Sequence, residues 1–255
     1  MKTVLITGAS SGIGKELAYV YAEKDYNLVL AARRKDRLTE IKNEISEKQG
    51  VSVDIFDIDL SKTDSAETLY KKVKDKNINV DVLINNAGFG MKGSFKDIDI
   101  TREESMLVLN MVTLTKLTRL FGNDMIGAGG GHIINIASTA AFQAIPGFAA
   151  YAASKAYVLN FSEAIAYELK DDNVKVTTIC PGATQSEFAK VAGMEKLPST
   201  GTKLPVSRDV AEFTYQMMTK GKVTAIHGSM NKLMAVGPRL MPRRLITKIA
   251  GKMME

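Results

Sequence analysis

The chain has 255 residues, 45% of them hydrophobic and 24% charged, with a net charge of +6, one cysteine and two histidines. A single cysteine excludes an intrachain disulfide, and so few cysteines and histidines argue against a zinc site, so no metal is expected. No apolar run approaches the roughly 18 residues of a membrane-spanning helix, and the first apolar stretch is too short for a signal peptide. These features predict a globular protein of a reducing, cytoplasmic compartment.

Strand-like apolar runs alternate with longer amphipathic segments up to about residue 227. We expect strands at 4–7, 28–32, 51–55, 80–84, 132–137, 174–180 and 224–227, and helices at 14–23, 35–47, 65–74, 103–125 and 151–170. Strands joined by helices of this length form right-handed βαβ units, and their parallel sheet is covered by helices on both faces. The sequence therefore predicts one α/β domain, residues 1–237, because no linker long enough to separate domains interrupts the pattern.

The first predicted strand runs into the glycine-rich stretch TGASSGIG, residues 7–14, and then into a helix. Small residues are needed where a tight turn lets the backbone and a helix N-terminus approach a pyrophosphate. The spacing is G-x-x-x-G-x-G, and such glycines also occur in loops that bind nothing, but the strand–turn–helix context favours a dinucleotide site. The candidate cofactor-binding residues here are Gly8, Ser10, Ser11, Gly12, Ile13 and Gly14.

Two arginines, Arg33 and Arg34, follow the second predicted strand, where a carboxylate would bind the ribose 2′-hydroxyl of NAD(H). A guanidinium group instead suits a 2′-phosphate. The alternative is a solvated basic loop. We expect NADP(H) rather than NAD(H), with Arg33 as the main contact and Arg34 as the second.

Polar and small residues also follow the third and fourth predicted strands. Asp59 is placed to accept a hydrogen bond from the adenine amino group, although it could instead cap the next helix. Asn85 is expected to tie neighbouring strands together. Ligands of open α/β sheets bind at the carboxyl ends of the strands, where all these residues fall. The further cofactor candidates are Asp59, Leu60, Asn86, Ala87 and Gly88.

A tyrosine and a lysine four residues apart, Tyr151 and Lys155, share one face of a predicted helix. A free tyrosine has a pKa near 10, and a neighbouring ammonium together with an oxidised nicotinamide favours the phenolate. Ser138, at the end of the fifth predicted strand, is placed to hold a substrate oxygen. Asn110 is a polar residue in an apolar helical stretch, where it either is a buried amide satisfied by a helix kink or holds a water that relays protons to Lys155.

Taken together, these motifs closely resemble the short-chain dehydrogenase/reductase family, in its short single-domain NADP(H)-preferring branch. The resemblance covers residues 2 to about 227. It rests on several motifs in register: TGASSGIG (7–14), Asp59, NNAG (85–88), Asn110, Ser138, YAASK (151–155) and PGATQSEF (181–188).

The resemblance implies a Rossmann-type doubly wound sheet of seven parallel strands in the order 3-2-1-4-5-6-7. It also implies hydride transfer between a nicotinamide cofactor and a carbonyl or alcohol, with Tyr151 as general acid/base and Lys155 lowering its pKa. Ser138 would orient the carbonyl, Asn110 would complete the catalytic set, and family members are usually homodimers or homotetramers. The resemblance assigns Pro181, Gly182 and Thr184 to the nicotinamide end, where Tyr151 and Lys155 would also contact the cofactor.

The substrate is expected to be a small carbonyl or alcohol compound of apolar character. The candidate walls are residues 89–92, residues 142–148 and a lid at about 185–204, with the apolar side chains Phe89, Met91, Phe142, Ile145, Phe188 and Met194. A second hypothesis is a non-catalytic, cofactor-sensing protein that binds a partner or a membrane through its tail. A pure sensor has no need of Ser138, Tyr151 and Lys155 together, so the enzyme is favoured. The sequence does not name the substrate, the direction of the reaction or its stereochemistry.

The last segment, residues 238–255, is a basic extension. It holds +4 of the net charge, which leaves about +2 for the other 237 residues, so no nucleic-acid partner is expected. Leu245, Ile246, Ile249 and Met253 recur at helical spacing, with lysines and an arginine on another side. We favour a helix that packs on its own subunit or a partner over one that lies on a membrane surface. A contact of the basic tail with an acidic substrate carrier is a further alternative that the sequence does not decide.

Overall fold

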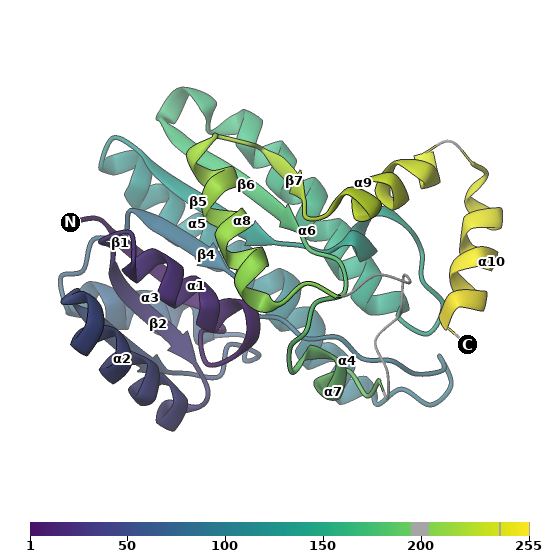
Figure 1. Ribbon diagram of the computed structural model, residues 1–255, viewed down its shortest axis with the longest axis horizontal. Coiled ribbons are helices and arrows are strands. Elements are labelled where there is room, and N and C mark those ends of the chain that lie inside the picture. The colour runs from purple at the N-terminus through teal and green to yellow at the C-terminus, as the bar shows by residue number, and fades with distance from the viewer. Residues whose placement is uncertain (195–203, 240, 255) are drawn as a thin grey trace.

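The computed structural model describes residues 1–194, 204–239 and 241–254, and its centre is a seven-stranded parallel sheet (Figure 1). The spatial order of the strands is β3-β2-β1-β4-β5-β6-β7, which confirms the predicted doubly wound order. Its members are β1 (Thr3–Thr7), β2 (Asn27–Ala32), β3 (Val53–Asp57), β4 (Val82–Asn85), β5 (Gly131–Ile136), β6 (Val174–Cys180) and β7 (Thr224–Ile226). The strands expected at 51–55 and 80–84 each begin two residues later than predicted, and the other strands lie within one residue of their predicted bounds.

Helices cover both faces of the sheet, as the near-continuous apolar strands require. One face is covered by α1 (Gly12–Ala22), α2 (Lys35–Gln49) and α8 (Ser207–Thr219), and α1 packs along α8 (Figure 1). The other face is covered by α3 (Ser65–Asp75), α5 (Leu114–Gly127) and α6 (Ala149–Glu168). The fully buried side chains include Leu17 and Leu38 on the first face and Phe121 on the second.

The helix predicted over 103–125 is interrupted, which corrects the expectation of one regular helix. It begins as α4 (Ile100–Leu107), widens into a π-helical turn at Val108–Thr113 and continues as α5. Asn110 lies in this turn and is buried. A π-turn inserts one extra residue into the helix, so it shifts which side chains face inward, and this turn is what directs the Asn110 amide toward the neighbouring loop.

The chain after β7 forms α9 (Ser229–Val236) and α10 (Arg243–Met254), which extend from one end of the sheet (Figure 1). In α10, Ile246 and Ala250 are buried, whereas Leu245 and Ile249 are 47% and 44% exposed. A side chain added at Gly251 would meet Pro146 at 3.3 Å, so this helix packs on its own chain at the 142–148 segment. None of the helices in the described ranges is both long and apolar enough to span a membrane.

A buried polar network joins the centre of the sheet to the helices on one face. The Asn85 amide donates to Asn135 Oδ1 and to Thr118 Oγ1, both at 2.9 Å, and the Asn135 amide donates to Ser162 Oγ at 2.8 Å. Ser162 in turn donates to the carbonyl of Val158. Asn85 therefore ties β4 to β5, as predicted, and the network fixes where α6 lies on the sheet.

The network generates a stability prediction. Replacing Asn135 by alanine removes one of the two hydrogen bonds of the Asn85 amide and the bond that Ser162 Oγ accepts, so we expect the free energy of unfolding to fall by about 1–3 kcal/mol. Urea denaturation measures this. Asn160→Ala, which removes an exposed amide from α6, is the control and should change stability by less than about 0.5 kcal/mol. An equal effect of the two substitutions would contradict the role given to the network.

Candidate active site

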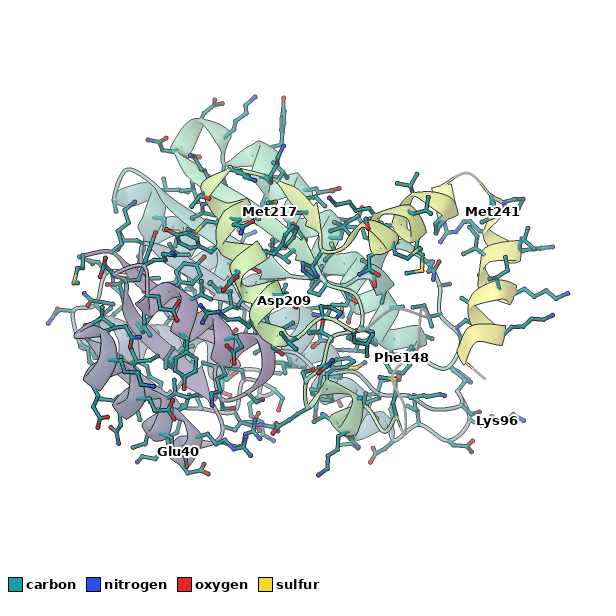
Figure 2. All side chains as sticks on the ribbon, in the orientation of Figure 1. Glu40, Lys96, Phe148, Asp209, Met217 and Met241 are labelled. Atoms are coloured by element: carbon teal, nitrogen blue, oxygen red, sulfur yellow. The ribbon has the colours of Figure 1, made fainter. Side chains whose placement is uncertain are left out.

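A pocket of about 490 Å³ opens where the carboxyl ends of the strands meet. Phe148, labelled in Figure 2, lines it on the side of the sheet from which α9 and α10 extend. Nineteen of the twenty candidate residues line this pocket, and the exception is Asn110. The nineteen are Gly8, Ser10, Ser11, Gly12, Ile13, Gly14, Arg33, Arg34, Asp59, Leu60, Asn86, Ala87, Gly88, Ser138, Tyr151, Lys155, Pro181, Gly182 and Thr184.

The glycine-rich turn after β1 leaves no room for side chains. Gly8 has φ +69°, and a Cβ there would lie 2.9 Å from Ala87 Cα, while a Cβ at Gly14 would lie 2.3 Å from the Gly8 carbonyl oxygen. Helix α1 begins at Gly12, its N-cap Ser11 makes no capping hydrogen bond, and its first turn contains no acidic side chain. The free N–H groups and positive dipole end of α1 therefore face the pocket, which fits an anionic pyrophosphate.

Thr7 and Asn86 hold this turn against the loop after β4. Thr7 Oγ1 accepts hydrogen bonds from the backbone N–H groups of Asn86 and Ala87, both at 3.0 Å. The Asn86 amide donates to the Thr7 carbonyl at 2.9 Å. Asn86 therefore shapes the glycine-rich turn through its hydrogen bonds with Thr7.

The two arginines after β2 lie at the far end of the pocket from Tyr151. Arg34 donates from Nε and Nη2 to Ser10 Oγ, at 3.3 and 3.2 Å, and from Nη1 to Glu187 at 2.9 Å. Arg33 is exposed. Burial raises the pKa of Asp59, but hydrogen bonds from Ser61 and the charge of Arg33 lower it on balance. Asp59 does not cap the next helix, because α3 begins after Asp64.

Tyr151, Lys155 and Ser138 converge at the other end of the pocket. Lys155 Nζ donates to the carbonyl of Ile136, at the end of β5, at 2.8 Å. Burial raises the pKa of Tyr151 to about 12, although a hydrogen bond with Ser138 acts in the opposite direction. Burial lowers the pKa of Lys155 to about 8. The protein groups by themselves therefore keep the phenol protonated at neutral pH, and the phenolate expected from Lys155 and an oxidised nicotinamide together stays a prediction.

Asn110 lies directly behind this end of the pocket. Its amide donates to the carbonyl of Phe89 at 3.0 Å and to Ser154 Oγ at 3.1 Å, and its Oδ1 accepts from the Phe89 backbone N–H at 3.3 Å. A Cβ at Gly88 would lie 3.0 Å from Asn110 Oδ1 and 3.4 Å from Lys155 Nζ. Protein groups at a helix irregularity thus satisfy the Asn110 side chain, and its part in a proton relay to Lys155 stays a prediction.

Apolar side chains surround Tyr151. The rings of Phe148 and Phe188 lie with their centroids 5.5 and 5.3 Å from that of Tyr151. Of the apolar wall residues expected from the sequence, Phe89, Ile145, Phe188 and Met194 line the pocket, and Met91 belongs to the same apolar cluster. Phe142 does not, because it packs with a separate cluster around Val158 and Cys180. Residues 195–203 of the expected lid lie outside the described residues.

Glu187 reaches the pocket from the segment after β6, within the motif at 181–188 and the lid expected from the sequence. Met234 also lines the pocket, from α9, and it lies outside the segments predicted to do so. No motif marks Met234, because contacts between segments far apart in the chain place it there. Within the described residues, no cluster of three His, Cys, Asp or Glu side chains is arranged to hold a metal ion.

The buried ammonium generates a prediction about pH. An unfolded lysine titrates near pH 10.4, so between about pH 8 and that value the unfolded chain keeps a proton that folded Lys155 has lost, and the free energy of unfolding rises with pH. Below pH 8 burial of the charge costs about 3 kcal/mol. We therefore expect Lys155→Met to be more stable than the wild type by about that amount at pH 7.

Lys155→Met should lose this gain in stability as the pH approaches about 10.5, because Lys155 of the wild type then becomes neutral in the unfolded chain as well as in the folded one. Urea unfolding across this range tests the expectation. Lys72→Met, which removes an exposed lysine of α3, is the control and should leave the pH profile unchanged. A stability difference between Lys155→Met and the wild type that stays constant with pH would contradict the buried charge as its cause.

Comparison with known proteins places this site in a family. The family model described as short chain dehydrogenase matches residues 2–196. The oxidoreductase EphD of Mycobacterium tuberculosis is 31% identical over 74% of this chain, and the match spans 32% of that longer protein.

Two other similarities extend over nearly the whole chain. Sulfoacetaldehyde reductase 2 of Chromohalobacter salexigens is 30% identical over 94% of both chains. A short-chain dehydrogenase from Sphingobium yanoikuyae, solved in complex with NADPH, is 28% identical over 94% of both chains, with a TM-score of 0.83. The chain therefore belongs to the short chain dehydrogenase family of oxidoreductases.

Proposed function

We propose that this protein is an NADP(H)-dependent oxidoreductase that interconverts a carbonyl compound and a secondary alcohol of apolar character, with Tyr151 as general acid/base. One observation carries the proposal. A single pocket has Ser138, Tyr151 and Lys155 at its apolar end and two arginines beside a glycine-rich helix N-terminus at its other end. When bound, the nicotinamide supplies the hydride for reduction or accepts it in oxidation.

Tyr151 and Ser138 act on the substrate oxygen. The pKa of Tyr151, raised to about 12 by burial, keeps its hydroxyl protonated, so in reduction it donates the proton that the carbonyl oxygen takes up. Ser138 Oγ, which accepts from the Ala140 N–H at 3.1 Å and is thereby oriented, hydrogen-bonds the same oxygen as charge develops on it. Tyr151 is left as phenolate and must be reprotonated before the next turnover.

Lys155 stabilises that phenolate. Its ammonium is cationic below its pKa of about 8, and Nζ lies 5.9 Å from the centroid of the Tyr151 ring. A cation at this range in a buried site favours the charged phenolate over the neutral phenol. Its hydrogen bond to the Ile136 carbonyl fixes Nζ, so the cation stays beside the tyrosine. Asn110 holds Phe89 and Ser154 in place around it.

The choice of NADP(H) rests on the arginines after β2. Arg33 and Arg34 both line the pocket, and Ser10 lies within hydrogen-bond distance of Arg34. A guanidinium group binds a phosphate with two parallel hydrogen bonds, and no carboxylate follows β2 at this point to bind a ribose hydroxyl. The similar Sphingobium enzyme was solved with NADPH, which supports the same choice.

The apolar walls around Tyr151 support a hydrophobic ketone, aldehyde or secondary alcohol as the substrate class. They come from Phe89, Ile145, Phe148, Phe188 and Met194. NADPH oxidation followed at 340 nm, with NADH in parallel and a panel of ketones, aldehydes, steroids, sugars and acyl thioesters, tests the proposal. Turnover of one class with NADPH supports it, and turnover only with NADH contradicts the cofactor choice.

We further propose that each subunit consists of one domain, residues 1–237, and the extension 238–255. The subunits form a homodimer or homotetramer, and the protein is cytoplasmic. The outer faces of α5 and α6 support an assembly surface. Tyr157 is 39% exposed, stacks on Phe161 at 5.7 Å and shares a 2.8 Å hydrogen bond with Thr115. The exposed Tyr157 and the half-buried Phe161 form an ordered apolar surface of the kind that subunit contacts cover.

The proton-transfer role generates a prediction for Tyr151→Phe. Removing the hydroxyl should lower kcat/KM for carbonyl reduction by about 10²- to 10⁴-fold, because the proton then has to come from solvent. The Kd for NADPH should change by less than about twofold, since the ring remains. Steady-state kinetics and a binding titration measure both. Tyr167→Phe, at a position 71% exposed, is the control, and full turnover by Tyr151→Phe would refute the assignment.

The arginines generate a second prediction. Arg33→Ala and Arg34→Ala should each weaken NADPH binding by about tenfold or more and leave NADH binding nearly unchanged, because each removes a charge-assisted hydrogen bond to the 2′-phosphate alone. Titrations with both cofactors give the ratio of the two Kd values. Lys48→Ala, which removes an exposed positive charge from α2, is the matched control. A ratio unchanged in both arginine variants would exclude them as the phosphate contacts.

A further inference from the structure

Two arginines at the end of the pocket that would hold the adenosine, Arg34 and Arg37, are already paired with the carboxylate of Glu187. Glu187 Oε2 accepts from Arg34 Nη1 at 2.9 Å, and Oε1 accepts from Arg37 Nη1 at 3.1 Å. Hydrogen bonds from Arg34 and Ser11, with the charges of both arginines, hold the pKa of Glu187 below its usual value. Glu187 is therefore an anion that spans from the glycine-rich turn to the start of α2.

The chain around Glu187 connects this end of the pocket to the other. The preceding residue, Ser186, lies against Gly12, where an added Cβ would be 3.3 Å from Ser186 Cβ. The following residue, Phe188, begins α7 (Phe188–Val191) and places its ring 5.3 Å from that of Tyr151. Residues 186–188 thus reach from the cofactor turn to the tyrosine within three positions.

The far end of α7 is anchored separately. Arg102 Nη2 donates to the Val191 carbonyl at 2.7 Å, and the Lys92 N–H donates to the Ala192 carbonyl at 2.8 Å. A displacement of Glu187 therefore cannot be absorbed by a free movement of the whole segment. It has to be taken up near the start of α7, where Phe188 lies.

We propose that Glu187 is a cofactor-discriminating residue, displaced from Arg34 by the 2′-phosphate of NADP(H), and that its displacement repositions Phe188 against Tyr151. The inference rests on the proposed NADP(H) dependence and deepens it. Arg34 Nη1 cannot donate to a carboxylate and a phosphate along the same direction, and two anions at this distance repel each other. A nucleotide without the 2′-phosphate leaves the Glu187–Arg34 pair intact, so it binds without changing the contacts of Phe188.

The first test measures binding of the adenosine half of the cofactor to the full-length chain. Adenosine 2′,5′-bisphosphate carries the 2′-phosphate and ADP does not, and neither reaches Tyr151. We expect Glu187→Gln to bind adenosine 2′,5′-bisphosphate about fivefold more tightly than the wild type, the size of one exposed ion pair, and to bind ADP with unchanged affinity. Glu212→Gln, which removes a carboxylate from the exposed pair with Arg208, is the matched control and should change neither affinity.

The outcomes separate this inference from the function on which it rests. Wild-type protein that binds ADP as tightly as adenosine 2′,5′-bisphosphate would refute the NADP(H) preference, and the inference with it. Wild-type protein that prefers the 2′-phosphate, with no gain in Glu187→Gln or an equal gain for ADP, would refute the inference alone. A purely structural role for the ion pair predicts that affinities for the two nucleotides change together.

The second test follows Phe188 directly. The chain contains no tryptophan, so Phe188→Trp introduces a unique fluorophore beside Tyr151. We expect its emission to change on addition of adenosine 2′,5′-bisphosphate and not of ADP, and the change to disappear when Glu187→Gln is added to the same protein. Emission unaffected by adenosine 2′,5′-bisphosphate, under conditions where titration calorimetry shows it bound, would refute the repositioning of Phe188.

Discussion

The end of the pocket around Tyr151 depends on one buried cation and the backbone carbonyl that accepts its hydrogen bond. Lys155 Nζ donates to the Ile136 carbonyl at the end of β5, and the residue is 6% exposed. Burial of an ammonium opposes folding, so α6 must be held on the sheet by other interactions. The Asn85–Asn135–Ser162 network and the apolar face of α6 supply them, and they position Tyr151 and Lys155 at the end of β5.

The two ends of the pocket differ in the way that their tasks require. Around Tyr151 the walls are aromatic and apolar, and burial raises the pKa of the phenol to about 12 and lowers that of Lys155 to about 8, so burial favours the neutral form of both groups. At the opposite end, the helix N-terminus at Gly12 and the guanidinium of Arg34 offer charge and N–H donors to an anion. Opposite environments within one cavity fix the orientation of an elongated ligand whose two ends differ in the same way.

Sequence patterns predicted the features of the structure that depend on the spacing of residues near one another in the chain. The strand order followed from the family resemblance, and the turn at residues 7–14 followed from its small residues, because steric and hydrogen-bond rules at a strand–helix junction are local. The π-turn around Asn110, the packing of Phe142 away from the pocket and the Arg34–Glu187 pair were not predictable. Each is decided by a contact between segments distant in the chain, and such a contact leaves no periodic trace in the sequence.

The electrostatics of the site bear on the protonation state of Tyr151. Burial raises the pKa of Tyr151 to about 12, so its hydroxyl is protonated across the neutral range, and Lys155 is cationic below about pH 8. In the proposed function a protonated phenol is the form that gives a proton to a carbonyl oxygen, whereas alcohol oxidation needs a phenolate, which burial disfavours. Formation of that phenolate therefore requires added positive charge beside Tyr151, which an oxidised nicotinamide would supply.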